Sequence, residues 1–521
     1  MPGIKKNKKY DWTVMLYCYP LDKVFDQPFE TLLYNLGKKS KSKNVKILGQ
    51  IYSKRNVYAL GIRDTASRIE VNSHGDVILV DHFQGRGIDI SSTESLADFM
   101  SWCRRKAPAK NYLLAIWDHG GCFYLFDSYE TKMMSMPSKF KMENVYKTAL
   151  IKKLYKSSPG RKKKYGYWFL AESSKNLSTS LKINRCINLT RRFEVPDENY
   201  SDKPKLIITN NRVGKYRLAL IVPEKLTPHF IETTIREPLD ALRFSLHNEN
   251  STGSLMVKEI KEAITISFPG KKVGNILFIA CCMQILETAY ELKDVCDFIT
   301  ASEDLMDFKV LENINSFEKL VKKPLQKPKD LAMQLVKDFP GYISGLVEQL
   351  GTLSSVQTSK IKDLAIQIDG LADYLISNRA KLKSTVKAAR NKCRYFSWLT
   401  KFCNIDFIWF LKNLHFATSD KKLKMLITEI INHTMHDPFL KQPTADKLVV
   451  SSFAGDARKG DLTKESYGAH GFTIFFPKNI NEFRNSGLFD FYTPGSPDIL
   501  SFVTEHKWAD FLTAYDFIGP L

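Results

Sequence analysis

The sequence lacks the features that mark several common classes of protein. Its nine cysteines are scattered and include no Cys-x-x-Cys pair, so we expect no disulfide scaffold. No apolar run approaches the roughly 20 residues that cross a bilayer, so no transmembrane segment is expected. An apolar stretch follows the N-terminal lysines, but it breaks at Pro20 and Asp22 without a small-residue cleavage site, which argues against an ordinary signal peptide. We therefore expect a soluble chain that is cytoplasmic or exported by a non-standard route.

Acidic residues are few relative to basic ones. The chain has 56 Asp and Glu against 77 Lys and Arg, a formal charge of +21. Such a surface attracts polyanions through counterion release. The excess of basic residues is concentrated in one part of the chain, however. The stretch from Thr131 to Ser180 holds twelve Lys or Arg against two acids. We interpret this stretch as a solvated, protease-accessible loop and expect no specific nucleic-acid partner.

No internal repeat is visible, and 521 residues exceed one hydrophobic core of usual size, so we expect a main domain and at least one further unit. Short apolar runs alternate with helical patterns, which indicates an α/β fold with a mostly parallel sheet covered by helices. The expected strands are Thr13 to Tyr17, Val45 to Tyr52, Tyr112 to Trp117, Asn275 to Ala280 and Phe298 to Ala301. Crossover helices are expected over Ser91 to Arg104, which opens with a Ser-Ser-Thr-Glu capping signal, and over Ile285 to Cys296.

Changes of pattern divide the chain into four expected segments. These are a first part of the main domain (10–124), a Lys-rich insertion (125–250), a second part of the main domain (251–345) and a mainly helical C-terminal region (346–521). The insertion is expected to contain a hairpin that joins Leu206 to Thr209 with Tyr216 to Val222. Helical periodicity in the C-terminal region covers 353–376, 382–414 and 421–433, and a strand over Gly471 to Phe476 precedes a last helix.

Two chemically capable residues follow expected strands. His119 lies just past the carboxyl end of the third strand, where open sheets place their ligands. Cys281 and Cys282 end the fourth strand and lead into a helix, whose N-terminal N–H groups stabilise a thiolate. Taken singly, each has a simpler interpretation, as a loop histidine and as buried, inert cysteines.

Taken together, the two segments resemble the clostripain-like family of cysteine peptidases. In that family one strand ends in an Asp/Asn-His-Gly-Gly motif with the catalytic histidine, and the next ends in an Asp-Ala-Cys-Leu-Met motif with the nucleophile. Here the motifs read Trp117-Asp-His-Gly-Gly121 and Ile279-Ala-Cys-Cys-Met283. Further similar segments are Leu96 to Trp102, Glu287 to Leu292, Ala301 to Glu303, Gly471 to Pro477 and Trp508 to Tyr515.

The resemblance implies a caspase-like three-layer sandwich and a cysteine endopeptidase that acts on peptides or proteins. Cys281 matches the nucleophile and His119 the general base, and the N–H groups of Gly120 and Cys281 would stabilise the oxyanion. The resemblance also implies self-processing in some members, which we expect between Tyr146 and Gly166. No metal site and no cofactor are expected for the chemistry. Calcium is implied for some members, but the sequence has no EF-hand loop to hold it.

One departure concerns substrate binding, which the resemblance assigns to Ile279, Ser302 and Glu303. The family has an Asp where Ile279 stands, and that acid helps to select Arg or Lys at the cleaved position. An apolar residue removes this charge partner, unless Glu303 supplies another. Two other interpretations stay open: a catalytically idle peptide-binding relative, and a polyanion-binding protein on the same fold. The sequence gives no indication of oligomeric state.

Overall fold

The chain divides into two compact units. The first comprises Met1–Phe126, Leu255–Gly495 and Ile499–Leu521, and the second comprises Asp127–Ser254 with Ser496–Asp498. The computed structural model describes residues 9–18, 42–53, 65–72, 74, 76–82, 91–125, 165–173, 183–194, 205–210, 216–223, 255–306, 315–324, 326–343, 350–396, 403–435, 446–456, 468–486, 488–496 and 498–519.

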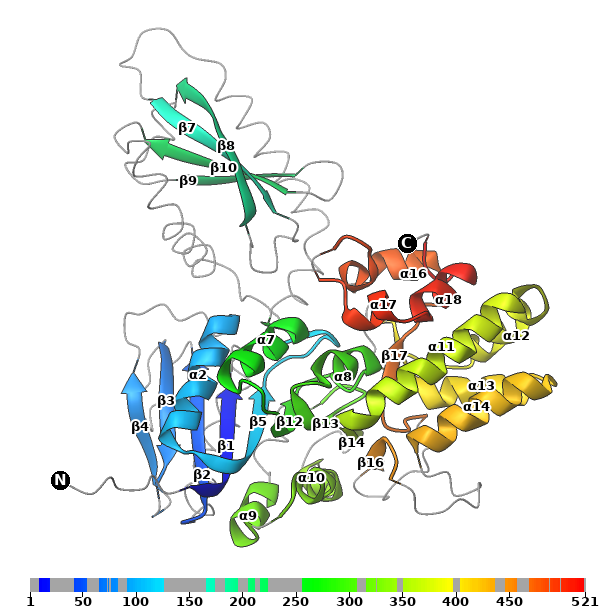
Figure 1. The fold of residues 1–521 in the computed structure, drawn as a ribbon, viewed down its shortest axis with the longest axis horizontal. Helices are drawn as coiled ribbons and strands as arrows, with labels where there is room; N and C mark the ends of the chain where they lie inside the picture. The colour runs from blue at the N-terminus through cyan, green and yellow to red at the C-terminus, as the bar shows by residue number, and fades with distance from the viewer. Residues whose placement is uncertain are drawn as a thin grey trace. The chain divides into compact units, whose positions relative to one another are not determined.

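A nine-stranded sheet organises the first unit (Figure 1). Its strand order is β16-β14-β13-β12-β5-β1-β2-β3-β4. The strands are β1 (Tyr10–Cys18), β2 (Val45–Ser53), β3 (Thr65–Val71), β4 (Val77–His82), β5 (Ala109–Trp117), β12 (Val273–Ile279), β13 (Cys296–Ala301), β14 (Leu350–Gln357) and β16 (Val449–Asp456). The strands from β13 to β2 in this order run parallel, and antiparallel strands flank them on both sides.

The parallel strands are the five that the sequence predicts. Parallel strands are buried on both faces, so most of them contain apolar runs, and β12 is buried at every position. The outer strands β3, β4, β14 and β16 were not predicted. In β14 the small polar residues Thr352, Ser354 and Ser355 are buried, and Ser355 shares a hydrogen bond with Thr300 of β13 (2.7 Å). Buried hydroxyl groups of this kind conceal the apolar pattern of a strand.

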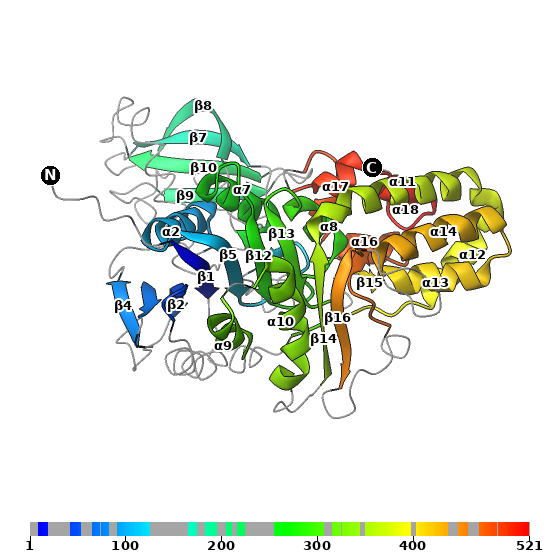
Figure 2. The same cartoon turned by 60° about the horizontal axis from the view of Figure 1, so that its bottom comes forward.

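Helices cover both faces of the sheet (Figures 1 and 2). One face packs on α2 (Thr93–Lys106), α7 (Val257–Ser267) and α8 (Leu286–Leu292), and the other on α9 (Asn315–Lys322) and α10 (Pro328–Ile343). The side chains of β5 alternate between the two cores, with Leu114 and Ile116 on the first face and Leu113 and Ala115 on the second. The α/β three-layer sandwich is therefore confirmed. The predicted N-terminal cap of α2 is also confirmed, because Ser92 Oγ accepts the N–H of Ser95 (3.1 Å).

The C-terminal region is helical only in part. Its further elements are η4 (Thr358–Lys360), α11 (Ile361–Ser377), α12 (Arg379–Asn391), β15 (Asn404–Asp406), α13 (Phe407–Ala417), α14 (Lys421–Thr434), β17 (Thr473–Phe475), α16 (Ile480–Asn485), η6 (Phe489–Tyr492), α17 (Ser501–Glu505) and α18 (Trp508–Ala514). The helix predicted over 353–376 is wrong up to Gln357, because β14 occupies that part. The helix predicted over 382–414 is wrong at Asn404–Asp406, because β15 occupies that part and pairs with β17.

The second unit contains a four-stranded antiparallel sheet of order β8-β7-β10-β9. Its strands are β7 (Tyr165–Ser173), β8 (Ile183–Glu194), β9 (Lys205–Asn210) and β10 (Tyr216–Pro223). The predicted hairpin is confirmed by the pairing of β9 with β10. In the first unit, β6 (Tyr124–Leu125) pairs with β11 (Leu255–Met256) where the chain leaves this unit and returns. The expected cut segment lies outside the described residues as far as residue 164.

None of the helices in the described part of the chain is both long enough and apolar enough to cross a membrane.

Candidate active site

The strand register brings the two predicted motifs to one edge of the sheet. Strands β5 and β12 are parallel neighbours, and Trp117 lies opposite Ile279. His119 and Cys281 each follow two residues after this pair. Both residues therefore leave the carboxyl edge of the sheet at the same level, as the sequence predicts for open α/β sheets.

Gly120 allows the two motif loops to touch. A β-carbon at Gly120 would lie 2.4 Å from the carbonyl oxygen of Cys281 and 3.0 Å from its nitrogen. Such contacts with backbone atoms cannot be relieved by a side-chain rotation. Gly121 is constrained in a different way, because a β-carbon there would lie 2.3 Å from the ring of Tyr124. Gly120 therefore lets the histidine loop lie directly on the peptide of Cys281, whereas Gly121 leaves room for the ring of Tyr124.

The two adjacent thiols have different environments. Cys281 is partly exposed, whereas the side chain of Cys282 is fully buried. Cys282 also has a φ of 58°, a left-handed conformation that a non-glycine residue adopts only when its surroundings impose it. Its N–H donates to the carbonyl oxygen of Asp304 (3.0 Å). Among the cysteines of the first unit, all of which are described, Cys281 is the only one that is not buried.

A backbone group adjoins the Cys281 sulfur. The N–H of Met306 lies 3.3 Å from Sγ, and the carbonyl oxygen of the same residue lies 3.7 Å from it. A thiol can donate to the carbonyl, and a thiolate can accept from the N–H, so Met306 can serve both protonation states. Sequence reasoning missed this residue, because a backbone donor carries no residue-type signal.

Two N–H groups next to the predicted oxyanion donors already donate hydrogen bonds to other backbone carbonyl groups. The N–H of Gly121 donates to the carbonyl oxygen of Tyr124 (3.0 Å), and that of Cys282 is used by Asp304 as described. The predicted donors, Gly120 and Cys281, belong to the two backbone segments in direct contact. Their assignment stays a prediction that this arrangement supports.

Asp118 sets the turn that follows β5. Its side chain is nearly inaccessible, and Oδ1 accepts the N–H of His119 (2.6 Å). This bond satisfies a backbone donor at the end of the strand and fixes the start of the His-Gly-Gly loop. The aspartate of the sequence motif therefore has a structural reason for its position.

The three predicted substrate-binding residues are all buried. Ile279 is 3% exposed and packs in the core beneath α9 and α10, and Ser302 is 0% exposed and hydrogen-bonds Thr352 (2.8 Å). Glu303 is 2% exposed, and its Oε1 accepts the N–H of Gly471 (2.8 Å). Direct contact of these side chains with a substrate stays a prediction. Within the described residues, no group of three or more His, Cys, Asp or Glu could hold a metal ion.

Comparisons with known proteins agree with the motifs. The model of the clostripain family (Peptidase_C11) matches residues 243–515, and no curated protein matches the chain. A secreted C11 cysteine protease from Bacteroides thetaiotaomicron is 14% identical, with 97% of this chain and 99% of that chain covered and a TM-score of 0.45. An inactive zymogen C11 protease from Parabacteroides distasonis is 12% identical, with 98% and 99% covered and a TM-score of 0.48. The family model alone carries the assignment, and because it matches more than half of the sequence, the chain belongs to the clostripain family of cysteine peptidases.

Proposed function

We propose that the chain is a cysteine endopeptidase in which Cys281 is the nucleophile and His119 transfers the proton. The observation that carries this proposal is the close approach of Gly120 to the peptide of Cys281, which joins the two motif loops at one edge of the sheet. The partial exposure of the Cys281 thiol supports it, because a substrate must reach the sulfur.

In the proposed reaction His119 accepts the thiol proton, and the Cys281 thiolate attacks the peptide carbonyl carbon. The N–H groups of Gly120 and Cys281 donate to the oxyanion that forms. Collapse of this intermediate breaks the C–N bond, and His119 returns the proton to the leaving amine. Water then attacks the resulting thioester, with His119 again as base, and releases the second product and the thiol. Before substrate binds, the N–H of Met306 supports the thiolate.

These steps use only side chains and backbone groups of the chain, so we propose that neither a metal nor an organic cofactor takes part in them. Calcium, which the family resemblance implies for some members, would act outside the chemical steps. A preference for Arg or Lys at the cleaved position is not expected. Ile279 carries no charge, and the carboxyl group of Glu303 is engaged by Gly471.

Substitution of the dyad tests the proposal. We expect Cys281→Ala and His119→Ala to lower hydrolysis of a mixed peptide library by at least about 1000-fold without a change in circular dichroism. Cys282→Ala is the matched control and should retain most activity, since that thiol is buried. Peptide binding without cleavage by the wild type would favour the idle relative. Salt-sensitive binding of a polyanion that survives Cys281→Ala would favour the third interpretation.

Self-processing is a finer part of the same proposal. A polar, Lys-rich segment opens locally at little cost and can enter a protease groove in extended form. We therefore expect a cut between Tyr146 and Gly166. Intact mass and N-terminal sequencing of the wild type beside Cys281→Ala measure it. Fragments in the wild type alone mean self-processing, fragments in both mean an outside protease, and an active uncut chain contradicts maturation by cleavage.

A further inference from the structure

Three buried ionisable groups meet beside the strand that follows the Cys281 loop. Glu303 is 2% exposed and lies two residues after the end of β13, Asp406 is 2% exposed and ends β15, and His470 is 0% exposed and precedes β17. Strands β15 and β17 pair, which brings Asp406 next to the chain before β17. The proposed chemistry uses none of these side chains, although buried charges of this kind are costly.

Hydrogen-bond donors surround Asp406. Its Oδ2 accepts the N–H of His470 (2.6 Å), and its Oδ1 lies 3.0 Å from Nδ1 of the same residue. Oδ1 also accepts the N–H of Trp409 at the start of α13. The other ring nitrogen of His470, Nε2, faces the Lys412 ammonium (3.4 Å), which can only donate. A hydrogen on Nδ1 therefore points to Asp406 Oδ1, which accepts it.

Glu303 also contacts Asp406, and this contact requires a proton. The carboxyl group of Asp406 lies beside that of Glu303, and Oε2 of Glu303 has no hydrogen-bond partner among the described residues. Two carboxylates have no hydrogen to share, so one acid must be protonated. Asp406 is already the acceptor of three donors, which assigns the proton to Glu303. Other charged groups near Glu303 are Asp304 and, through it, Arg394 (3.8 Å).

The backbone around Glu303 reaches the nucleophile. The Glu303 carbonyl oxygen accepts from Asn404 Nδ2 (3.3 Å), and Oε1 accepts the N–H of Gly471 (2.8 Å). One residue later, the carbonyl oxygen of Asp304 accepts the N–H of Cys282, and Met306 then presents its N–H to Cys281 Sγ. The segment from Ser302 to Met306 is thus anchored at Glu303 and touches both residues of the Cys-Cys pair.

We propose that Glu303, in its protonated form, is a positioning residue whose bonds to Asp406 and Gly471 hold the 302–306 segment so that the Met306 N–H meets the Cys281 sulfur. This inference rests on the proposed function, in which Cys281 is the nucleophile. Burial and the neighbouring carboxylate of Asp406 raise the pKa of Glu303 well above its ordinary value, which favours the protonated form. Ionisation would set two buried carboxylates against each other and release the segment.

Alkylation of Cys281 by iodoacetamide tests the proposal in the full chain, with Cys281→Ser as the background. Glu303→Gln keeps a donor for Asp406 and an acceptor for Gly471, whereas Glu303→Leu keeps a similar volume and neither bond. We expect the alkylation rate at neutral pH to fall less than about threefold in Glu303→Gln and more than about tenfold in Glu303→Leu. The control Glu291→Gln, an acid on α8 outside this cluster, should match the wild type. Equal rates in the Gln and Leu variants would overturn the proposal.

If Glu303→Leu does not fold, the pH profile of Glu303→Gln decides alone. As the pH rises from neutral into the alkaline range, the alkylation rate of the wild type should fall by about threefold or more relative to Glu303→Gln, because only the carboxylic acid can ionise. Identical profiles overturn the proposal. Equal alkylation of the wild type and Cys281→Ser would instead show that Cys281 is not the reactive thiol, which contradicts the proposed function itself.

Discussion

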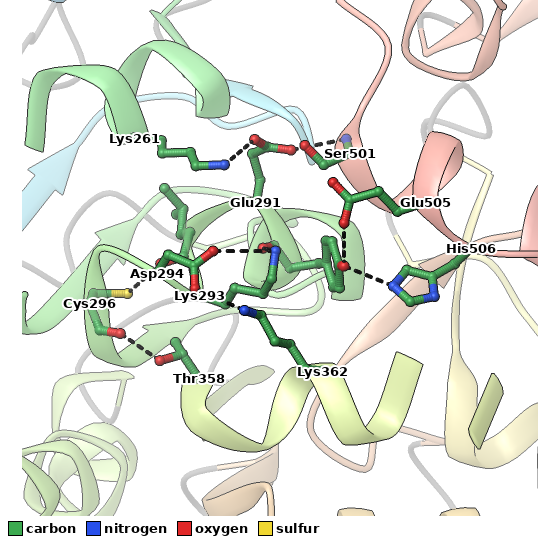
Figure 3. A network of polar contacts seen from close by, with 12 residues as sticks. Lys261, Glu291, Lys293, Asp294, Cys296, Thr358, Lys362, Ser501, Glu505 and His506 are labelled. Atoms are coloured by element: carbon green, nitrogen blue, oxygen red, sulfur yellow. Dashed lines mark hydrogen bonds and ion pairs between the residues drawn. The ribbon is translucent and has the colours of Figure 1, made fainter. Parts of the chain in front are cut away.

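The two ends of α8 carry buried glutamates whose pKa values are shifted in opposite directions. At the first turn, Glu287 Oε1 accepts the N–H of Phe475 (3.0 Å) and the hydroxyl of Tyr492, and no cation contacts it among the described residues. Burial raises the pKa of Glu287 to about 7. One turn later, Glu291 binds Lys261 Nζ (2.9 Å) and accepts the N–H of Ser501 (3.1 Å), as Figure 3 shows. Burial pushes the pKa of Glu291 upward, but Lys261 holds it below its ordinary value.

Burial alone therefore does not decide the charge of these acids, since both glutamates are at most 2% exposed. A cation within hydrogen-bonding distance decides it. Glu303 follows the pattern of Glu287, because the group next to it is the carboxylate of Asp406. Glu287 and Glu303 bind the N–H groups of Phe475 and Gly471, so two acids with raised pKa values hold the chain at and just before β17. Glu291, whose pKa is lowered, pairs instead with Lys261 from α7.

Removal of the Glu287 carboxyl group should have the largest effect. Glu287→Ala leaves the Phe475 N–H and the Tyr492 hydroxyl buried without their acceptor and opens a cavity. We expect the free energy of unfolding to fall by about 3–5 kcal/mol, measured by urea denaturation near pH 6. Glu291→Ala is the matched control one turn away and should cost less, because water can reach Lys261, whose side chain is 31% exposed. Equal losses in the two variants would contradict the contrast between the two ends of α8.

The sequence could predict the meeting of the two motifs, but not the contacts between buried acids and partners that lie far away along the chain. The His119 and Cys281 motifs follow the apolar runs Tyr112 to Trp117 and Ile276 to Ala280, so their meeting at one sheet edge follows from parallel pairing. The partners of Glu303 lie more than 100 residues away, at Asp406 and Gly471, and no local pattern connects them. From the sequence, Glu303 is therefore predicted to bind substrate through its carboxylate. In the structure, its side chain has two partners within the chain, Asp406 and Gly471.

The outer strands were unpredictable for a related reason. The alternation that marks a strand depends on apolar residues at the buried positions. In β14 several buried positions are occupied by hydroxyl side chains that bond to β13 and to the loop after it, as Ser355 and Thr352 do. Periodicity in this stretch therefore favoured an extension of α11. The backbone donor at Met306 is invisible for the same kind of reason, because its role depends on a position in space and not on its side chain.

An intermediate effect is expected when Glu287 is made unable to ionise. Its pKa is raised in the folded chain, so between about pH 4.5 and 7 the unfolded chain loses the proton and the folded chain keeps it. The stabilisation from Glu287 is thus complete below its ordinary pKa and is lost as the pH rises toward 7. Over this window the wild type should lose about 3 kcal/mol relative to Glu287→Gln, since one pKa unit corresponds to about 1.4 kcal/mol. Parallel curves of unfolding free energy against pH would contradict this assignment. Glu303 titrates in both proteins, so the difference isolates Glu287.

The smallest effect belongs to the ionised end of α8, and its dependence on pH has the opposite sign. Lys261→Gln removes the cation that lowers the pKa of Glu291, so at neutral pH we expect a loss of about 1 kcal/mol, typical of a pair with one exposed partner. A lowered pKa contributes stability that is present above the ordinary value of the acid and is lost as the pH falls through the folded value. The difference between wild type and variant should therefore shrink below about pH 4.5, where Glu291 gains its proton.

Lys271→Gln, which removes an equal charge from an exposed position shortly after α7, serves as the control for the net charge of the chain. Chemical denaturation of the three proteins at neutral and acidic pH measures both quantities. A Lys261 effect that grows on acidification, or one that Lys271→Gln reproduces, would mean that this cation does not set the charge of Glu291.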